Sequence, residues 1–455
     1  MIQPWRSTEF DRTIGQIAWP ALGALAADPL ISIVDTAFVG RLGTQELAAL
    51  GVSAAVFLFA FSLFNFLAYG TTPLIAHALG RGETGEAARY AGQAVALAVA
   101  LGIVAMVGLR GLATEVVGLI GGGGDTVGMA AQYVTIRALA LPAMLVITAG
   151  HGIFRGHGDT RTPLWITLAF NVINVVLDPL LIFGAGWGLG GAAVATVVAQ
   201  NVGAVLFLVV LLRPRGSLTL VDFARPTVAS IRVFLSVGGA IVVRTTSLLV
   251  VFTVATSVAA RVSSAAVAGH QVVGQIWFFL GFAIDALAIA AQTMVARVRA
   301  ESGIAAAKLL TFRLLWMGLV VGGAFSVMLI ALRPWIAGWF TQSAAVLAEV
   351  DAVYPILIWL VPLGALVFVW DGIAIGFTSL RFIAGAMAVA MVIAVGVLML
   401  VEPRGWGLPG VWWGIAVLVL VRAVSFVVWH VVGPLRAQGQ GRVSRGEKTP
   451  GTSQQ

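Results

Sequence analysis

The stretch FIAGAMAVAMVIAVGVLMLV, residues 382–401, carries no charged side chain. It is long enough to cross the hydrocarbon core of a bilayer, which takes about 20 apolar residues. The whole chain has the same character, because 60% of its 455 residues are hydrophobic and only 10% are charged. Soluble domains are about half apolar and about a quarter charged, and a soluble fold of this chain would expose large apolar patches. The composition therefore predicts an integral membrane protein and argues against soluble, secreted and nucleic-acid-binding classes.

Apolar runs like this one recur along the chain between clusters of charged and turn-forming residues. Backbone groups in lipid must bond within their own segment, so runs of this length are expected to be helices. We therefore predict an all-α polytopic membrane protein with twelve transmembrane helices. The predicted spans are residues 14–39, 47–75, 89–111, 128–153, 163–184, 189–212, 229–259, 265–295, 306–331, 347–376, 379–401 and 409–433.

Lysine and arginine residues are unequally divided between the two sets of predicted loops. With the N-terminus inside, 19 of the 27 fall on the inner side, Arg155 among them, and 5 on the outer side. The other three, Arg137, Arg244 and Arg422, lie within spans. Cytoplasmic loops carry such an excess, so we expect both termini in the cytoplasm and the protein in a bacterial plasma (inner) membrane. No cleavable signal peptide is evident, and residues 434–455 are predicted to be a disordered basic tail.

The two halves of the chain repeat at a nearly constant offset. Pro142 aligns with Pro362, and the pair Gly152 and Gly156 aligns with Gly372 and Gly376. Six helices per repeat is an even number, so both halves enter the membrane in the same orientation. The sequence thus predicts two six-helix bundles related by a pseudo-two-fold axis along the membrane normal, as in secondary transporters, with the substrate site between them.

The predicted divisions are an N-terminal lobe of residues 1–215, a C-terminal lobe of residues 216–433 and the tail. A second repeated motif, Gly186-Trp187-Gly188-Leu189, recurs as Gly405-Trp406-Gly407-Leu408 at almost the same offset. The Gly-x-x-x-Gly pairs favour close helix contact, which we expect within one monomer rather than in a dimer.

Acidic residues inside the first lobe are the main candidates for function. Ionisable groups at mid-bilayer are costly and usually face a cavity or a partner. Asp28 and Asp35 are seven residues apart, on one face of the first helix, and Pro29 is expected to kink that helix. Asn174 and Asp178 are four apart on one face of the fifth helix. The repeat places no acid opposite Asp35 or Asp178 in the second half, which favours cation coupling in one lobe.

Other charged residues in spans form a possible secondary network. Arg137 is the cation that would neutralise the first-lobe acids if they serve packing alone. In the second half, Arg244, Asp285 and Asp371 share a lobe, and a structural ion-pair network is an equal alternative to function there. His151, at the repeat position of Asp371, either titrates near neutral pH or caps a helix end.

The chemistry that these residues suggest is exchange of protons. Burial disfavours the charged form of a carboxyl, so such a group can take up a proton on one side of the membrane and release it on the other. A Na⁺ site would need several converging oxygens, to which Asn174, Asp178 and Thr196 would contribute. We expect no cofactor and no metal centre, and the absence of cysteine excludes thiol ligands.

Several motifs, taken in order, point to one family. The chain resembles the multidrug and toxic compound extrusion (MATE) family, most of all its DinF-type branch. The segments that carry the resemblance are Val34 to Gly40, Leu47 to Gly51, Arg137 to Pro142, Gly156 to Leu164, Asn174 to Pro179 and Trp370 to Gly376.

The resemblance implies a V-shaped pair of bundles and cation-coupled drug export by alternating access. It implies that Asp35 takes part in proton and drug coupling, together with Asn174, Asp178 and Thr196. Two positions depart from the family pattern: Ile31 stands where some relatives have tyrosine, and Gln292 where some have an acidic residue. Gln292 argues against a Na⁺ site in the second lobe.

The main functional hypothesis is a proton-coupled antiporter that exports amphipathic or cationic drugs and toxic metabolites. A lipid-linked oligosaccharide flippase is the alternative, although it should bring several arginines into a central cavity and only three lie in spans. An intramembrane enzyme is not expected, because no His-Glu-x-x-His, aspartate-rich or serine-elbow motif occurs. A channel is disfavoured by the repeat, which suggests two lobes that rock.

Overall fold

The computed structural model describes residues 9–120, 125–213, 220–223, 228–341 and 343–432. Within these ranges the chain is helical, with turns and no strand. Ten of the described helical segments are long and apolar enough to cross a membrane. The prediction of an all-α membrane protein is confirmed.

The first part of the chain, up to Leu212, folds into one bundle. Its helices are α1 (Glu9–Val39), α2 (Thr44–Phe64), α3 (Phe66–Gly80), α4 (Thr84–Gly111), α5 (Ala113–Ile120), α6 (Asp125–Arg137), η1 (Ala138–Ala140), α7 (Leu141–Gly156), α8 (Arg161–Pro179), η2 (Leu180–Gly184) and α9 (Gly188–Leu212). Helix α7 packs against α3, α4 and α9, and α1 packs against α8. The pairs α2–α3, α6–α7 and α8–η2 each correspond to one predicted span.

The second bundle starts at residue 228. It contains α10 (Val228–Val262), α11 (Ser264–Ile336), η3 (Ala337–Trp339), α12 (Ala344–Gly376), α13 (Leu380–Leu398) and α14 (Gly407–Val432). Gly303 interrupts α11 with a φ of 81°, a backbone conformation that favours glycine, and there the chain turns back on itself. Helix α11 therefore supplies two spans, and each of the twelve predicted spans coincides with described helix over most of its length. The predicted boundary at 215 and the tail 434–455 lie outside the described residues.

The internal repeat is visible in how helices pack. A Cβ on Gly152 would lie 2.9 Å from Ala68 Cα, and one on Gly372 would lie 2.3 Å from the Ala288 carbonyl oxygen. The contacts of α7 on α3 thus recur in the second half as contacts of α12 on α11. Close approach of this kind requires glycine, and both contacts are within one chain, as the repeat predicted.

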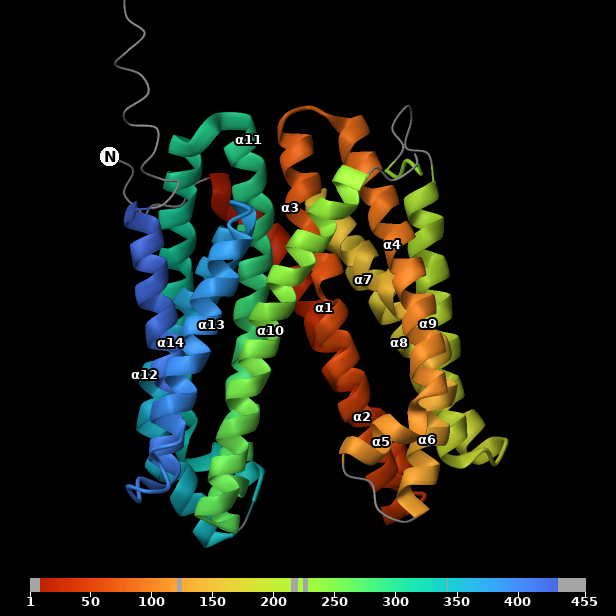
Figure 1. Cartoon of the computed structure of the whole chain (residues 1–455), viewed down its shortest axis with the longest axis vertical. Helices are drawn as coiled ribbons and strands as arrows, with labels where there is room; N and C mark the ends of the chain where they lie inside the picture. Colours follow the sequence, from red (N-terminus) through yellow and green to blue (C-terminus); the bar gives the residue numbers. More distant parts are fainter. Residues whose placement is uncertain (1–8, 121–124, 214–219, 224–227, 342, 433–455) are drawn as a thin grey trace, which may run out of the picture.

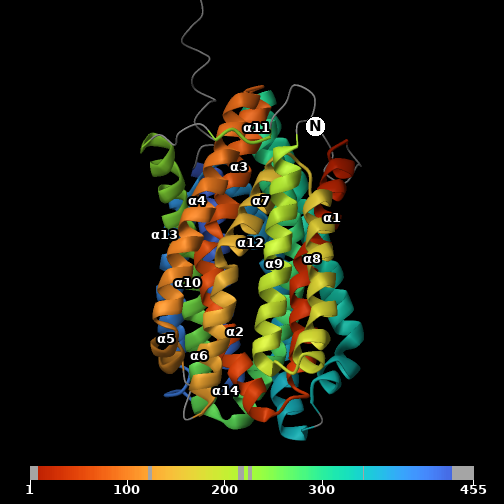
Figure 2. The ribbon, with the colours of Figure 1, turned by 90° about the vertical axis from the view of Figure 1, so that its right-hand side faces the viewer.

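The two bundles stand side by side and meet near one end. Figure 1 shows them converging at the end that carries the N-terminal side of α1, the α3–α4 turn and the bend in α11, and diverging toward the other end. The turned view in Figure 2 shows the helices running roughly parallel along the long axis. We call the contact between the two bundles the seam. There, α1 and α3 of the first bundle pack on α11 of the second, and α2 and α3 pack on α10.

Named contacts hold this seam together. Arg313 Nε of α11 donates to Asp11 Oδ1 of α1 at 2.8 Å. Gln292 Nε2 donates to the Tyr69 carbonyl oxygen at 3.0 Å. Gln292 thus has a structural role between the bundles.

Candidate functional site

Asp35 and Asp178 meet inside the first bundle. Asp35 lies one turn before the end of α1, and Asp178 lies in the last turn of α8 and is fully buried. Their side chains face each other within hydrogen-bonding range. A carboxylate has no hydrogen to donate, so such contact needs a proton on one of the two groups. The structure therefore brings together the two acids that the sequence singled out, and their contact can hold one proton.

Local backbone irregularity positions Asp178. Pro179 has no N–H to donate, so the helical ladder cannot continue regularly past it. A π-helical turn, η2, follows directly after Pro179. Such turns are frequent at functional sites. The regular helical ladder thus ends directly after Asp178.

The other predicted members of the site contribute unequally. Asn174 Nδ2 donates to Asp178 Oδ1 at 3.4 Å, one turn earlier on α8. Thr196 on α9 is buried, and its Oγ1 donates to the carbonyl oxygen of Ala192 in its own helix. Among the described residues Thr196 makes no hydrogen bond to Asp178.

Helix α1 runs unbroken through Pro20 and Pro29. The backbone of Asp28 belongs to it, seven residues before Asp35, but the Asp28 side chain lies outside the described residues. A bend at Pro29 therefore stays a prediction.

Arg137 lies close to the pair of acids but does not bind them. Its guanidinium stacks over Phe57, with Cζ 4.4 Å from the ring centroid, and over Tyr133 at 5.9 Å. Asp35 is within electrostatic range of it. No ion pair joins Arg137 to either acid within the described ranges. Arg137 thus acts on Asp35 through its charge at a distance and not through a direct ion pair.

Tyr133 is a residue that sequence reasoning missed. It is buried on α6, one turn before Arg137, and its hydroxyl is within electrostatic range of Asp35 and Asp178. Its spacing from Arg137 and the rarity of tyrosine, with 4 in the chain, were the available signals. Neither one reveals that Tyr133 comes within electrostatic range of both acids.

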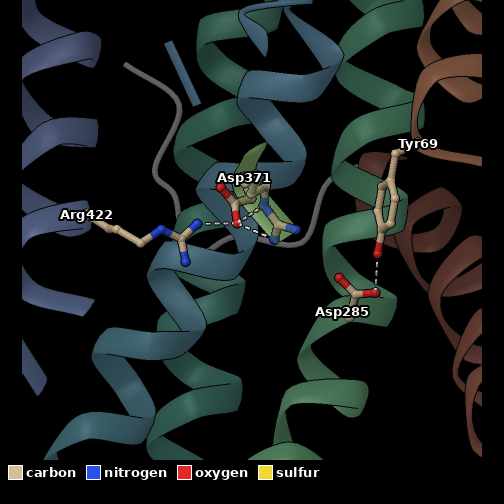
Figure 3. A network of polar contacts seen from close by, with 5 residues as sticks. Tyr69, Asp285, Asp371 and Arg422 are labelled. Atoms are coloured by element: carbon tan, nitrogen blue, oxygen red, sulfur yellow. Dashed lines mark hydrogen bonds and ion pairs between the residues drawn. The ribbon is translucent and has the colours of Figure 1, made fainter. Parts of the chain in front are cut away.

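A second polar cluster lies in the other bundle (Figure 3). Arg244 Nη2 of α10 binds Asp371 Oδ2 of α12 at 2.7 Å, and Arg422 of α14 binds the same oxygen. Asp371 and Arg422 are buried, and Trp370 stacks on Phe426 beside them. The ion-pair network considered for this lobe exists, with Arg422 as the added member.

Asp285 is separate from that ion-pair network. Tyr69 of α3 donates its hydroxyl hydrogen to Asp285 Oδ2 of α11 at 3.0 Å, so this bond crosses between the bundles (Figure 3). Neither the tyrosine nor its place at the seam was anticipated, because the two residues are 216 positions apart in the chain.

Two residues lie in unexpected surroundings. His151 Nε2 is 3.2 Å from Thr167 Oγ1 and its ring packs on Phe207, so it sits inside the first bundle rather than at a helix end. Arg155, counted above as a loop residue, is 9% exposed. Among the described residues no group of three or more His, Cys, Asp or Glu is placed to hold a metal ion.

Comparison with known proteins identifies this architecture. The MatE family model matches residues 20–180 and again residues 240–400, so it fits each half of the chain once. The chain belongs to the MatE family. The duplicated match agrees with the repeat found in the sequence, and MatE proteins are multi-pass membrane transporters.

Relatives of this MatE chain include plant and bacterial proteins. Protein DETOXIFICATION 44, chloroplastic, from Arabidopsis thaliana is 36% identical over 90% of this chain and 80% of its own length. DNA damage-inducible protein F from Escherichia coli K12 is 28% identical over 93% of each chain. A crystal structure of MATE in the bent conformation superposes with a TM-score of 0.84, at 22% identity, over 93% of this chain and 95% of that one. The resemblance to the MATE family and its DinF-type branch is therefore confirmed.

Proposed function

We propose that this MatE transporter exports amphipathic or cationic small molecules in exchange for protons. The observation that carries the proposal is the contact between Asp35 and Asp178 in a buried part of the first bundle. A proton held between the two carboxyls removes their mutual repulsion. Loss of that proton leaves two negative charges in contact, which favours separation of α1 from α8 or capture of a cationic substrate.

Movement of α1 would connect this site to the seam. The same helix carries Asp35 near one end and Asp11 near the other, and Asp11 binds Arg313 of the second bundle. Displacement of α1 by a protonation change thus reaches an inter-bundle contact directly. This gives alternating access a physical route through one element.

The charge distribution supports an orientation for the present state. The end at which the bundles meet carries the loops that are rich in arginine, which the positive-inside rule assigns to the cytoplasm. Together with the divergence of the bundles toward the other end, this supports an outward-facing state, cytoplasmic termini and a bacterial plasma membrane location. The Escherichia coli relative supports the bacterial membrane, whereas the plant relative is named as chloroplastic.

The substrate surface that we propose lies between the bundles. A pocket there is lined by α2 and α10 side chains that mix apolar groups with hydroxyls: Phe59, Ser62, Leu63, Val242, Thr245, Thr246 and Leu249. This hollow is smaller than a drug-sized site, so a substrate would enter it only when the bundles move further apart; its apolar groups and hydroxyls would then suit amphipathic compounds. The flippase alternative is not favoured, since Arg244 and Arg422 are already paired with Asp371 and Arg137 lies on aromatic rings.

The test is transport by purified protein in liposomes. We expect the cationic dye rhodamine 123 to be moved when a pH gradient alone is imposed, and not when a Na⁺ gradient alone is imposed. Asp35→Asn and Asp178→Asn should each abolish the pH-driven movement. Asp351→Asn is the matched control, because Asp351 is an exposed acid in the first part of α12. Undiminished pH-driven transport by both site variants, or transport driven by Na⁺ alone, would rule out the proposed coupling.

A further inference from the structure

Arg155 is nearly covered and makes no hydrogen bond or ion pair in the described residues, yet none of its guanidinium nitrogens is sealed from solvent. It is the penultimate residue of α7 and is 9% exposed. The described part of the chain offers it no hydrogen bond and no ion pair within 4 Å, in contrast to Arg244, Arg313 and Arg422. Burial of a charge is costly unless the charge is paired and hydrogen-bonded. Arg155 avoids that cost only because its nitrogens reach solvent, which leaves this guanidinium accessible to an anion.

The position of Arg155 is at the seam between the bundles. Gly152 and Gly156 let α7 lie flat on α3, with Ala68 and Ile75 opposite them. This close approach brings the Arg155 side chain within electrostatic range of Tyr69 on α3 and of Asp285 on α11 of the other bundle. The Tyr69–Asp285 hydrogen bond crosses the same seam (Figure 3).

The charges in this region do not balance. The seam and the adjoining cluster contain three guanidiniums, of Arg155, Arg244 and Arg422, and two carboxylates, of Asp285 and Asp371, so the formal charge is +1. Each acid has arginine within range in its own bundle, because Asp371 binds Arg244 and Arg422, and Arg244 is also within range of Asp285. Arg155 is also within range of Asp285, and it alone among these five groups makes no hydrogen bond or ion pair.

Separation of the bundles at this seam would isolate Arg155 further. Tyr69 and Arg155 would stay with the first bundle, and Asp285 and Arg244 with the second, because the elements that carry them belong to different bundles. Arg155 would then face the opened space with Tyr69 beside it, whose hydroxyl would have lost its acceptor. A guanidinium and a phenol hydroxyl that both donate, with no acid beside them, form a receptor for one carboxylate.

We propose that Arg155 and Tyr69 bind the carboxylate of an anionic or zwitterionic amphipathic substrate when the bundles separate at this seam. The inference rests on the proposed export function and adds a substrate class to it. Arg155 acts as a specificity residue for the acidic group, while Asp35 and Asp178 serve the coupling ion. One guanidinium binds one carboxylate, which matches a substrate with a single acidic group.

Two dyes that differ by one group test the inference. Rhodamine 110 carries a free carboxyl group, and rhodamine 123 is its methyl ester. Their dissociation constants are measured by fluorescence polarisation on the full chain in lipid nanodiscs. We expect Arg155→Gln to weaken binding of rhodamine 110 by about 10-fold or more, and binding of rhodamine 123 by less than about twofold. Arg155→Lys should retain part of the preference, and Arg161→Gln, an exposed arginine at the start of α8, should change neither constant.

A stability measurement separates recognition from a structural role. Because Arg155 has no hydrogen bond or ion pair to lose, Arg155→Gln should melt at the wild-type temperature or above it. Equal weakening of both dyes together with a lowered melting temperature would mean a structural role and would overturn the inference. Unchanged rhodamine 110 binding in Arg155→Gln, or no rhodamine 110 binding by the wild type, would also overturn it.

The same dyes keep the two proposals distinguishable. Arg155→Gln should still export rhodamine 123 under a pH gradient, because coupling rests on Asp35 and Asp178. If the wild type fails to export rhodamine 123 but Arg155→Gln weakens binding of rhodamine 110 alone, the coupling proposal fails and the carboxylate site stands. If the pH gradient drives export of rhodamine 123 but Arg155→Gln binds both dyes as the wild type does, the coupling proposal stands and the carboxylate site fails.

Discussion

At the scale of single residues, the roles are set by what lies next to each side chain. Asp35 and Asp178 occupy separate helices and gain significance only because the two carboxyls meet. Arg155 is similarly unremarkable in sequence, and its burial at the seam makes it a candidate for recognition. The packing glycines show the same dependence, since their importance follows from the neighbour's backbone.

Gly372 provides a residue-scale prediction. A Cβ there would lie 2.3 Å from the Ala288 carbonyl oxygen, and a backbone atom cannot rotate aside. We expect Gly372→Ala to lower the free energy of unfolding by about 1–3 kcal/mol, as overpacked cores do. Gly396→Ala on α13 is the matched control, because a Cβ there meets open space and alanine favours helix by up to ~1 kcal/mol. Denaturation of the two variants in detergent measures both effects, and equal stabilities would contradict the assigned contact.

At the scale of elements, the turns before α9 and α14 show the repeat in backbone form. Gly186 and Gly188 have φ of 71° and 52°, and Gly405 and Gly407 have φ of 62° and 59°. All four values lie in the left-handed region that side chains with a Cβ rarely adopt. Equivalent turns therefore start the last helix of each bundle in the same way.

These turns give an element-scale prediction. A Cβ on Gly186 or Gly405 would meet no atom within 4 Å, so alanine there suffers only the backbone penalty. Gly186→Ala and Gly405→Ala should each lower the free energy of unfolding by about 1–2 kcal/mol, with similar losses in the two bundles. Thermal unfolding of both variants checks this. A loss at one turn alone would show that the repeat does not extend to the energetics of these turns.

At the scale of the whole molecule, transport requires the seam to open. Gly80 of α3 lies against the second bundle so closely that a Cβ there would be 2.7 Å from Ala300 Cβ and 2.6 Å from the Arg297 carbonyl oxygen. Together with the Asp11–Arg313 pair, this contact closes the end of the molecule where the bundles converge.

A covalent link across this seam should stop the transport cycle. The chain has no native cysteine, so Gly80→Cys with Ala300→Cys introduces the only thiols. Their short separation allows a disulfide after a small shift. Oxidation should abolish proton-driven dye export, and reduction should restore it, as measured in liposomes. Each single-cysteine variant is the control, and full transport by the oxidised double variant would mean that the seam does not open there.

The sequence by itself determined the class and layout of this protein. Apolar length fixes the helices, because lipid leaves backbone groups no other partner, and most of the run at 382–401 lies in α13, which ends at Leu398. The nearly constant offset between the halves revealed the repeat, because equivalent contacts such as those of Gly152 and Gly372 need the same small residue at the same place. Spacing along one helix also paired Asn174 with Asp178, since residues four apart share a face.

Only the tertiary structure decided which helices face one another and what each charge meets. No local pattern encodes that α1 and α8 bring Asp35 to Asp178, that Thr196 bonds to its own helix instead, or that Tyr69 reaches Asp285 across the seam. An arginine near a helix end also looks the same in sequence whether it reaches the loop or is buried, as Arg155 is. Periodicity fixes direction around one helix axis, whereas these contacts depend on the rotation and depth of two helices, which packing across the whole bundle sets.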